Sequence, residues 1–319
     1  MGGEAGLGLD AGGTQCRWAL ADAQGQVVQE GLAGSFNGQQ VHTKAGRDHI
    51  HQALASVRHV VQTASAAVAG SSATASGGQP ALVAAWAGVT GFDGQGGEAL
   101  QVHLARCLGL SPGALQLYND VELAHRVSLS KGSGYLVYAG TGCIATYLDA
   151  QDQLHRVGGR GETLGDDGSG YWIGCQALKA VWRAEDEDPG YVQDSLLAQA
   201  LFQAVGGANW EDTRRFMHLA SRGDVGRLAL AVAAVADQDP LARGLLQSAG
   251  LELGRLAALL IRHHGPRPVW LAGGAFELHP LLQSSMVHGL PEGTRVQRLK
   301  LAAHRGAARH AVGVSEFPS

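Results

Sequence analysis

The sequence has few of the features that would point to an extracellular, membrane-bound or metal-centred protein. Its 319 residues contain four cysteines, and no two of them form a CxxC pair. Scattered cysteines of this kind are typical of reduced, half-buried thiols in a cytoplasmic protein, and they provide no disulfide framework. The 14 histidines form no HExxH motif and no Cys/His spacing. A zinc site built by the protein is therefore not expected.

Long apolar runs are also missing. The longest, LALAVAAVA at residues 228–236, has less than half of the roughly 20 residues that span a bilayer. The first ten residues, MGGEAGLGLD, hold no basic region of the kind that begins a signal peptide. The net charge of -4 gives no electrostatic reason to bind nucleic acid or an anionic membrane. We therefore expect a cytoplasmic protein with a small-molecule partner, no nucleic acid and no membrane contact.

The sequence does have a large apolar fraction. Hydrophobic residues make up 45% of the chain and charged residues 16%, which is the composition of a globular protein with a sizeable core. Because domains usually run to roughly 100–200 residues, a chain of this length is expected to form two of them.

The opening stretch, LGLDAGGTQCRWALADAQGQVV at residues 7–28, predicts a hairpin with a glycine-rich loop at its tip. Gly12 and Gly13 let main-chain N–H groups approach an anion closely, and Thr14 adds a hydroxyl donor. Asp10, at the strand end, could hold a magnesium ion against phosphate groups. The alternative is an ordinary tight hairpin turn.

A second copy of this unit follows at residues 134–158, GYLVYAGTGCIATYLDAQDQLHRVG. Adding 127 to the first copy aligns Thr, Cys, Asp and Gln residues as well as glycines, so low complexity does not explain the match. The repeat predicts two similar α/β lobes with facing Gly/Thr loops, the second at Gly140, Thr141 and Gly142, and a phosphate chain would fit between them. The same alignment places Val137 opposite Asp10, so only one loop retains an acid, as expected for a single cation.

Two further stretches are candidates for binding or catalysis. The segment GGRGETLGDDGSGYWIG at residues 158–174 is too rich in Gly and Asp for a simple linker, although Asp167 or Ser169 could cap the helix that follows. Asn119 and Asp120 follow the strand LQLY. Asp120 could be a helix N-cap, or it could be a base that accepts a proton from a sugar hydroxyl, because α/β folds build their sites at strand C-terminal ends.

Together these residues resemble the actin-like ATPase and sugar-kinase superfamily, and within it the N-acetylglucosamine kinase group of the BadF/BadG/BcrA/BcrD ATPase family. The resemblance covers nearly the whole chain and rests on these motifs: DAGGT at 10–14, ND at 119–120, AGTG at 139–142, GDDGSGYWIG at 165–174 and AGGA at 272–275. It implies an α/β, two-lobed actin-like (ribonuclease H-like) fold with duplicated lobes and a central cleft. It also implies ATP-dependent phosphorylation of an amino sugar, with N-acetylglucosamine 6-phosphate as the expected product.

The resemblance further implies residue roles. Asp10 would serve Mg²⁺ and Asp120 would be the catalytic base. The ATP-binding residues would be Gly12, Gly13 and Thr14, Gly140, Thr141 and Gly142, and Gly273 and Gly274. The residues lining the amino-sugar pocket would be Asn37, Gly88, Asn119, Asp120, Gly159 and Asp166. A homodimer is expected because dimers are common among such kinases.

The chain departs from the N-acetylglucosamine enzymes at residues 158–161, which read GGRG where those enzymes tend to read GGWG. Arg160 is closer to the glucosamine kinases of the same family, so glucosamine is an alternative substrate. An iron–sulfur activator ATPase of the 2-hydroxyacyl-CoA dehydratase type is a further alternative, although Cys107, Cys143 and Cys175 lack the expected spacing. A sugar-sensing regulator would be expected to carry a DNA-binding helix-turn-helix, for which the predicted first strand leaves no room.

The predicted lobes are residues 1–118 and 119–303. A C-terminal helix at 304–315 is expected to pack back on the first lobe.

Overall fold

The chain forms two compact units in the computed structural model, which describes residues 4–12, 15–61, 81–92, 94, 96–315 and 317. Unit 1 comprises Met1–Ser130 and Leu301–Ser319, and unit 2 comprises Lys131–Lys300. The predicted lobe boundary at 118/119 thus falls too early, because residues 119–130 belong to unit 1, where their helix packs on strand β4 (Ala81–Val89).

Unit 1 is built on a five-stranded sheet in the order β3-β2-β1-β4-β5. Strands β1, β4 and β5 run parallel, and β2 and β3 continue the sheet in antiparallel fashion. The other strands are β1 (Glu4–Ala11), β2 (Cys16–Asp22), β3 (Val27–Ala33) and β5 (Leu115–Tyr118). The helices are η1 (Gly38–His42), α1 (Lys44–Ala53), α3 (Gly97–Leu108), η2 (Pro112–Ala114), α4 (Asp120–Arg126) and α12 (Ala303–Ala311), and residues 55–61 are also helical.

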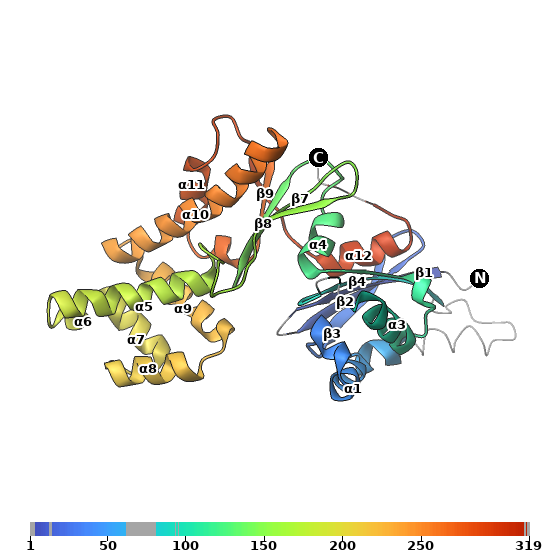
Figure 1. Ribbon diagram of the computed structural model, residues 1–319, viewed down its shortest axis with the longest axis horizontal. Coiled ribbons are helices and arrows are strands. Elements are labelled where there is room, and N and C mark those ends of the chain that lie inside the picture. The colour runs from blue at the N-terminus through green and yellow to red at the C-terminus, as the bar shows by residue number, and fades with distance from the viewer. Residues whose placement is uncertain are drawn as a thin grey trace, which may run out of the picture. The chain divides into compact units, whose positions relative to one another are not determined.

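Helix α12 covers one face of this sheet and brings the C-terminal segment back to unit 1 (Figure 1). It packs on β1, β2 and β4. Gly6 and Gly8 of β1 make the close approach possible, because a side chain on either would collide with the backbone of α12 at Ala308. The predicted C-terminal helix at 304–315 corresponds to α12.

Unit 2 repeats the architecture, with a five-stranded sheet in the order β10-β9-β6-β7-β8. Its strands are β6 (Tyr135–Ala139), β7 (Cys143–Leu148), β8 (Leu154–Gly158), β9 (Val269–Ala272) and β10 (Val296–Arg298). Its helices are α5 (Gly170–Glu187), α6 (Tyr191–Asp194), α7 (Leu196–Val205), α8 (Trp210–Leu219), α9 (Arg222–Val235), α10 (Pro240–His264), η3 (Gly274–Glu277) and α11 (Pro280–His288). The order β8-β7-β6-β9-β10 matches β3-β2-β1-β4-β5, as a duplication requires.

The register of the two hairpins corrects one detail of the repeat. Ala11 pairs with Cys16 in unit 1, and Ala139 pairs with Cys143 in unit 2. The first strands therefore align with an offset of 128 and the second strands with 127, because the β1–β2 loop is one residue longer. Asp10 is equivalent to Tyr138, and the predicted equivalence with Val137 is wrong. The conclusion that the second loop lacks an acid is unchanged.

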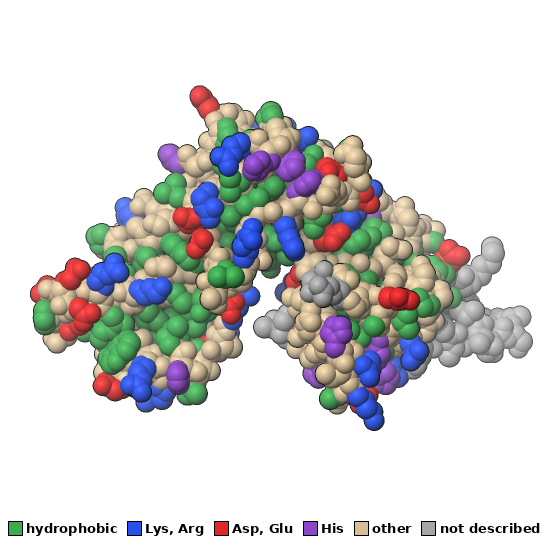
Figure 2. Space-filling model, viewed as in Figure 1, with side chains coloured by type: hydrophobic (Ala, Val, Ile, Leu, Met, Phe, Trp, Pro, Cys, Tyr) green, Lys and Arg blue, Asp and Glu red, His purple; other side chains and the backbone are tan. Residues whose placement is uncertain are grey.

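Helix α10 is long and apolar enough to cross a membrane, judged by length and composition alone. One face of the helix packs into the interior of unit 2, where Leu246, Leu253 and Leu260 are at most 1% exposed, whereas Leu251 is 50% exposed. Asp239 caps its start by accepting from the amides of Leu241 and Ala242. Figure 2 shows hydrophobic side chains also gathered on the surface between α5 and α8.

Candidate active site

In unit 1, the predicted catalytic residues lie at the carboxyl ends of two parallel strands, β1 and β5, which flank β4. Asp10 is the penultimate residue of β1 and pairs in register with Gly88 of β4. Strand β5 ends at Tyr118, and Asp120 begins the helix that follows. This edge of a parallel sheet is where α/β folds place their ligands.

Asp10 has an unusual electrostatic environment. Burial, reinforced by the negative charge of Asp120, raises the pKa of the Asp10 carboxyl to about 6, against a smaller lowering by Arg17. Two carboxylates that repel one another in a partly dry site favour a cation between or beside them. Asp10 is therefore suited to bind a positively charged partner.

A magnesium ion fits this donor set when it arrives with a nucleotide. Within the described ranges, no group of three or more His, Cys, Asp or Glu side chains could hold a metal ion. Mg²⁺, however, is usually bound by one or two carboxylates together with phosphate oxygens and water. Asp10 would hold the ion, and the nucleotide would complete its coordination.

Asp120 is the first residue of α4, and the N-cap is Asn119. The Oδ1 atom of Asn119 accepts from the amide of Val121 at 3.0 Å, and Asp120 Oδ1 accepts from the same amide at 3.0 Å. Burial raises the pKa of Asp120, although hydrogen bonds from Val121 and the hydroxyl of Thr90 oppose this. The alternative that Asp120 is the helix N-cap is wrong, because the cap is Asn119. A carboxylate whose pKa is raised by burial is a stronger proton acceptor than a solvated one.

Asn119 is occupied at both ends of its amide. Its Nδ2 donates to the carbonyl of Phe92 at 3.1 Å, while its Oδ1 caps α4. The structure thus gives it a positioning role, since it joins the β4–α3 loop to the helix that carries Asp120.

Gly88, predicted to line the sugar pocket, packs against α4. A Cβ atom at this position would lie 2.8 Å from the side chain of Leu123 and 3.1 Å from Cα of Asp120. Its lack of a side chain therefore lets α4 come close to the sheet.

Asn37 caps η1 by accepting from the amide of Gln39 at 3.1 Å. This segment is held next to the carboxyl end of β4, because the Gly38 amide donates to the carbonyl of Thr90 and the Thr90 amide donates to the carbonyl of Ala11. Among the described residues, the Nδ2 group of Asn37 has no hydrogen-bond partner and could donate to a ligand.

The tip of the β1–β2 loop lies partly outside the described residues, since Gly13 and Thr14 are not among them. The Gly12 amide donates to the carbonyl of Gln15 at 3.0 Å, which closes the loop.

The equivalent loop of unit 2 is described in full, and its carbonyls are held by the first residues of α5. The amide of Gly170 donates to the carbonyl of Gly140 at 2.9 Å, and the amide of Tyr171 donates to that of Thr141 at 3.1 Å. The amides of Thr141 and Gly142 have no partner among the described residues. A loop with its carbonyls occupied and two amides free is prepared to bind an anion.

Asp166 lies beside this loop in a buried ion pair that the sequence did not predict. Its carboxylate, in a residue that is 4% exposed, accepts from the amide of Cys143 at 3.3 Å and pairs with Arg222 at the start of α9. Arg222 also lies 3.4 Å from Glu162. A side chain on Gly142 would collide with Arg222. Burial raises the pKa of Asp166, and Arg222 is the main opposing influence.

The remaining glycines have distinct positions in unit 2. Gly159 has a φ of +65° and donates its amide to the carbonyl of Cys143 at 3.1 Å. Gly273, with a φ of +99°, comes so close to Ala139 that any side chain would collide with its backbone. Gly274 begins η3, and no atom lies within 4 Å of where its Cβ would be. Of these, Gly274 leaves the most room for a ligand.

The cysteines are dispersed between the two units. Cys16 and Cys107 belong to unit 1, and Cys143 and Cys175 to unit 2. Burial raises the pKa of the Cys16 and Cys143 thiols to about 12. Such thiols are inert at neutral pH.

Two curated relatives share parts of this sequence. The N-acetylmuramic acid/N-acetylglucosamine kinase of Clostridium acetobutylicum is 34% identical over 100 residues, which is 31% of this chain and 32% of that protein. The N-acetyl-D-glucosamine kinase of Dictyostelium discoideum is 27% identical over 188 residues, which is 57% of this chain and 55% of that protein. The matches thus span about a third and about half of the relatives' lengths.

Solved structures share the whole fold. A candidate N-acetylglucosamine kinase from Chromobacterium violaceum has a TM-score of 0.70 and 25% identity, covering 97% of this chain and 98% of that one. The ROK family glucokinase of Streptomyces griseus, solved with glucose and AMPPNP, has a TM-score of 0.56 and 15% identity, covering 96% and 98%. These likenesses confirm the predicted α/β fold of actin-like sugar kinases.

The sequence profile of the BadF/BadG/BcrA/BcrD ATPase family matches residues 7–307, almost the full length. The predicted resemblance is therefore confirmed, and the chain belongs to the BadF/BadG/BcrA/BcrD ATPase family.

Proposed function

We propose that this protein transfers the γ-phosphoryl group of ATP to an amino sugar, with the 6-hydroxyl of N-acetylglucosamine as the acceptor. The observation that carries the proposal is the pair Asp10 and Asp120 at the carboxyl ends of β1 and β5, on either side of β4 in unit 1, where burial and the charge of Asp120 raise the pKa of Asp10. One of these carboxylates would bind a cation and the other would accept a proton. The curated relatives, both amino-sugar kinases, support the same acceptor class.

Binding of ATP would use the duplicated loops. Gly12, Gly13 and Thr14 of unit 1 and Gly140, Thr141 and Gly142 of unit 2 would bind the phosphates through their amides. The free amides of Thr141 and Gly142 support this role. Gly273 and Gly274 would lie at the adenosine, and Asp10 would hold Mg²⁺, which neutralises phosphate charge when bound.

Asp120 would act as the general base. Its carboxylate would accept the proton of the sugar hydroxyl as that oxygen attacks the γ-phosphorus, with ADP as the leaving group. Phosphoryl transfer needs positioning and charge neutralisation more than covalent help, so backbone amides and two carboxylates suffice. Alignment of the two substrates can remove roughly 7–11 kcal/mol of the barrier.

Several residues would recognise the sugar or position the groups that do. Asn37 has a free Nδ2 group that can donate to a hydroxyl or an acetyl carbonyl. Asn119 and Gly88 would act by positioning α4, whereas Gly159 and Asp166 would contribute from unit 2.

Arg160 bears on which amino sugar is preferred. It is exposed, and no ion pair with a described acid engages it. A free guanidinium pairs well with a carboxylate, and N-acetylmuramic acid differs from N-acetylglucosamine by an ether-linked lactyl carboxylate. We therefore include N-acetylmuramic acid among the acceptors, beside N-acetylglucosamine and glucosamine.

We further propose that the protein works in the cytoplasm as a homodimer. Light scattering on a size-exclusion column tests the dimer, and a mass near the monomer value of 33.1 kDa would exclude it.

The proposed activity is tested by coupled ADP release with Mg-ATP and each of N-acetylglucosamine, glucosamine, N-acetylmuramic acid and glucose. The phosphorylated product is then examined by ³¹P NMR, in which coupling to the C6 methylene protons identifies a 6-phosphate. Sugar-dependent ADP release with one amino sugar is expected. An equal rate with no sugar present would contradict the proposal.

A further inference from the structure

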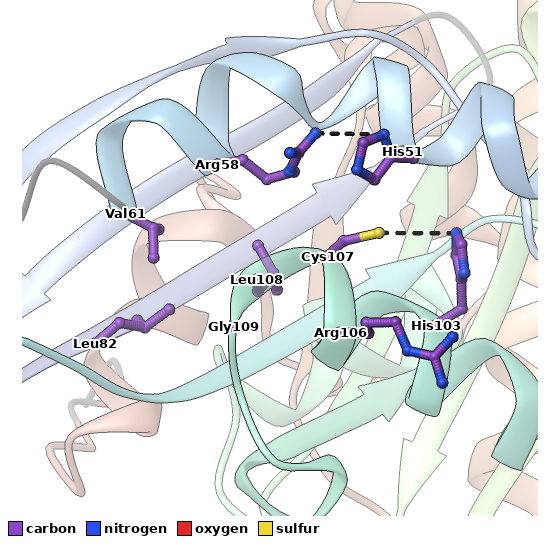
Figure 3. Close-up of a pocket in the computed structure, with 9 residues that line it drawn as sticks. All are labelled: His51, Arg58, Val61, Leu82, His103, Arg106, Cys107, Leu108 and Gly109. Carbon is purple, nitrogen blue, oxygen red and sulfur yellow. Dashed lines mark hydrogen bonds between the residues drawn. The ribbon is translucent and has the colours of Figure 1, made fainter. Parts of the chain in front are cut away.

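A cavity of about 510 Å³ lies in unit 1, between α1 with the following helical segment 55–61 on one side and α3 on the other. Its volume is within the range of small-molecule sites, roughly 300–1,000 Å³. Figure 3 shows that Arg58 and His51 enter from the first side, whereas His103, Arg106 and Cys107 belong to α3. Figure 2 shows His, Lys and Arg side chains gathered around α1.

The described lining of the cavity is cationic. It includes Arg58, Arg106, His51 and His103 and, among the residues that the structure describes, no Asp or Glu. Among the described residues, neither arginine forms an ion pair with a carboxylate. Both guanidinium groups lie close enough to Cys107 to lower the pKa of its thiol, although burial raises that pKa more. Two uncompensated positive charges therefore share one cavity.

Both histidines of the cavity are hydrogen-bonded. A guanidinium has no acceptor, so Arg58 Nη1 donates to Nδ1 of His51 at 3.3 Å. His103 Nε2 donates to the carbonyl of Arg47 at 3.1 Å. Burial is the main cause that lowers the pKa of His103, the hydrogen bond to the Arg47 carbonyl opposes this, and nearby positive charge, including that of Arg106, adds to the lowering.

One end of the cavity is apolar. Val61, Leu82 and Leu108 line it, and Val61 and Leu108 are at most 5% exposed. The position of Arg106 has a structural explanation, because it lies in the last turn of α3 and cations interact favourably with the carbonyls at helix C-termini. It does not account for Arg58, which belongs to the next helical segment and turns toward His51 (Figure 3).

We propose that this cavity binds the phosphate group of a small phosphate monoester, with the apolar body of the ester against Val61, Leu82 and Leu108. A phosphate monoester carries about −1.5 to −2 charges at neutral pH, which balances two arginines better than a single carboxylate does. Arginine is also well matched in geometry to phosphate oxygens.

The site is separate from the proposed active site. Leu82 is near the start of β4 and Gly88 near its end, and six residues of strand span about 20 Å. The cavity therefore lies at the opposite edge of the unit 1 sheet from Asp10 and Asp120. Its ligand would act as an effector, not as a substrate.

The test is isothermal titration calorimetry of the full chain at low salt with phenyl phosphate, inorganic phosphate and benzyl alcohol. Phenyl phosphate combines the dianion with an apolar ring, and the other two probes each lack one of these parts. We expect one site for phenyl phosphate, with an affinity at least about tenfold above that for inorganic phosphate, and no measurable binding of benzyl alcohol.

Two variants test the role of the arginines: the double variant Arg58→Gln with Arg106→Gln, and the single variant Arg106→Gln. Because Arg106 is exposed, the single variant should fold normally. The control is Arg183→Gln with Arg214→Gln, two exposed arginines of α5 and α8 that change the net charge equally. We expect at least about a tenfold loss of affinity in the double variant, a smaller loss in the single variant and none in the control. The sugar-phosphorylation rate without effector should not change in any of them, so failure of this proposal is distinguishable from failure of the proposed function.

Three outcomes would overturn the proposal. These are no saturable binding of phenyl phosphate up to about 10 mM, an equal loss of affinity in the control variant, and binding of inorganic phosphate as tight as that of phenyl phosphate.

Discussion

A Cβ atom on Gly88 would lie 3.1 Å from Cα of Asp120, the first residue of α4. The same atom would lie 2.8 Å from the side chain of Leu123, so a methyl group cannot be added without moving the helix. Gly88 is also the register partner of Asp10. The proposed base is therefore placed by the absence of a side chain on the neighbouring strand.

Gly88→Ala is expected to push α4 away from β4. Overpacking of this kind costs about 1–3 kcal/mol of stability, and a displacement of about 1 Å can lower the rate roughly 100-fold. We expect kcat for sugar phosphorylation to fall at least about tenfold. The loss of stability should be too small to unfold the protein. Gly113→Ala is the control, because no atom lies within 4 Å of its Cβ position. Equal activities in the two variants would contradict this role of Gly88.

His125 should make the stability of unit 1 depend on pH. It is 0% exposed on α4, and burial, with a smaller contribution from Arg126, lowers its pKa from 6.5 to about 4. The unfolded chain therefore binds more protons than the folded chain between pH 6.5 and 4, and stability falls as the pH is lowered through this range. We expect the wild type to lose about 2 kcal/mol relative to His125→Gln between pH 8 and pH 5.

Denaturant unfolding at several pH values measures this effect. His218→Gln, which removes an exposed histidine of α8, should retain the wild-type pH dependence. A parallel pH profile for the wild type and His125→Gln would show that His125 is not the residue responsible.

Arg222→Gln should leave the buried carboxylate of Asp166 without its main charge partner. An unpaired buried charge costs several kcal/mol in a dry site, but the Arg222 side chain is 40% exposed, so we expect a loss of about 1–3 kcal/mol. Because Asp166 is proposed to contribute to sugar recognition and lies with Arg222 against Gly142 of the proposed ATP loop, the KM values for the sugar and for ATP should both rise. Arg227→Gln, which breaks the exposed pair with Asp224 on the same helix, should leave both KM values unchanged. Unchanged KM values for both substrates in Arg222→Gln would contradict these assignments.

Arg160→Gln tests the preference for the acceptor. If the guanidinium pairs with the lactyl carboxylate, kcat/KM for N-acetylmuramic acid should fall about tenfold, as for loss of a charge-assisted contact. The value for N-acetylglucosamine should stay within about twofold. A uniform fall for both sugars would instead place Arg160 in contact with a feature they share.

The sequence repeat was sufficient to predict two similar lobes because both hairpins keep the same Gly, Thr, Cys and Asp positions. It did not reveal the extra residue in the β1–β2 loop, because an ungapped comparison applies one offset to both strands. The first strands align with an offset of 128 and the second strands with 127. The equivalence of Asp10 with Tyr138 follows only from the pairing of Ala11 with Cys16 and of Ala139 with Cys143.

The candidate site was predictable where chemistry is local and not where it depends on tertiary contacts. Asp10, Asp120 and the glycine loops stand out at strand ends. Arg222 does not, because it lies 56 residues after Asp166 and carries no motif. The sequence left open whether Asp120 is the N-cap, since Asn119 and Asp120 are both favourable caps and only the backbone shows that the helix begins after Asn119.

The most direct test of the account compares the wild type with Asp120→Asn. The substitution keeps the size of the side chain and removes its ability to accept a proton. We predict that the rate of ADP release with Mg-ATP and the preferred amino sugar falls by roughly two to four orders of magnitude, while calorimetry shows that the sugar still binds. An Asp120→Asn enzyme that keeps the wild-type rate would contradict the central claim that Asp120 is the base.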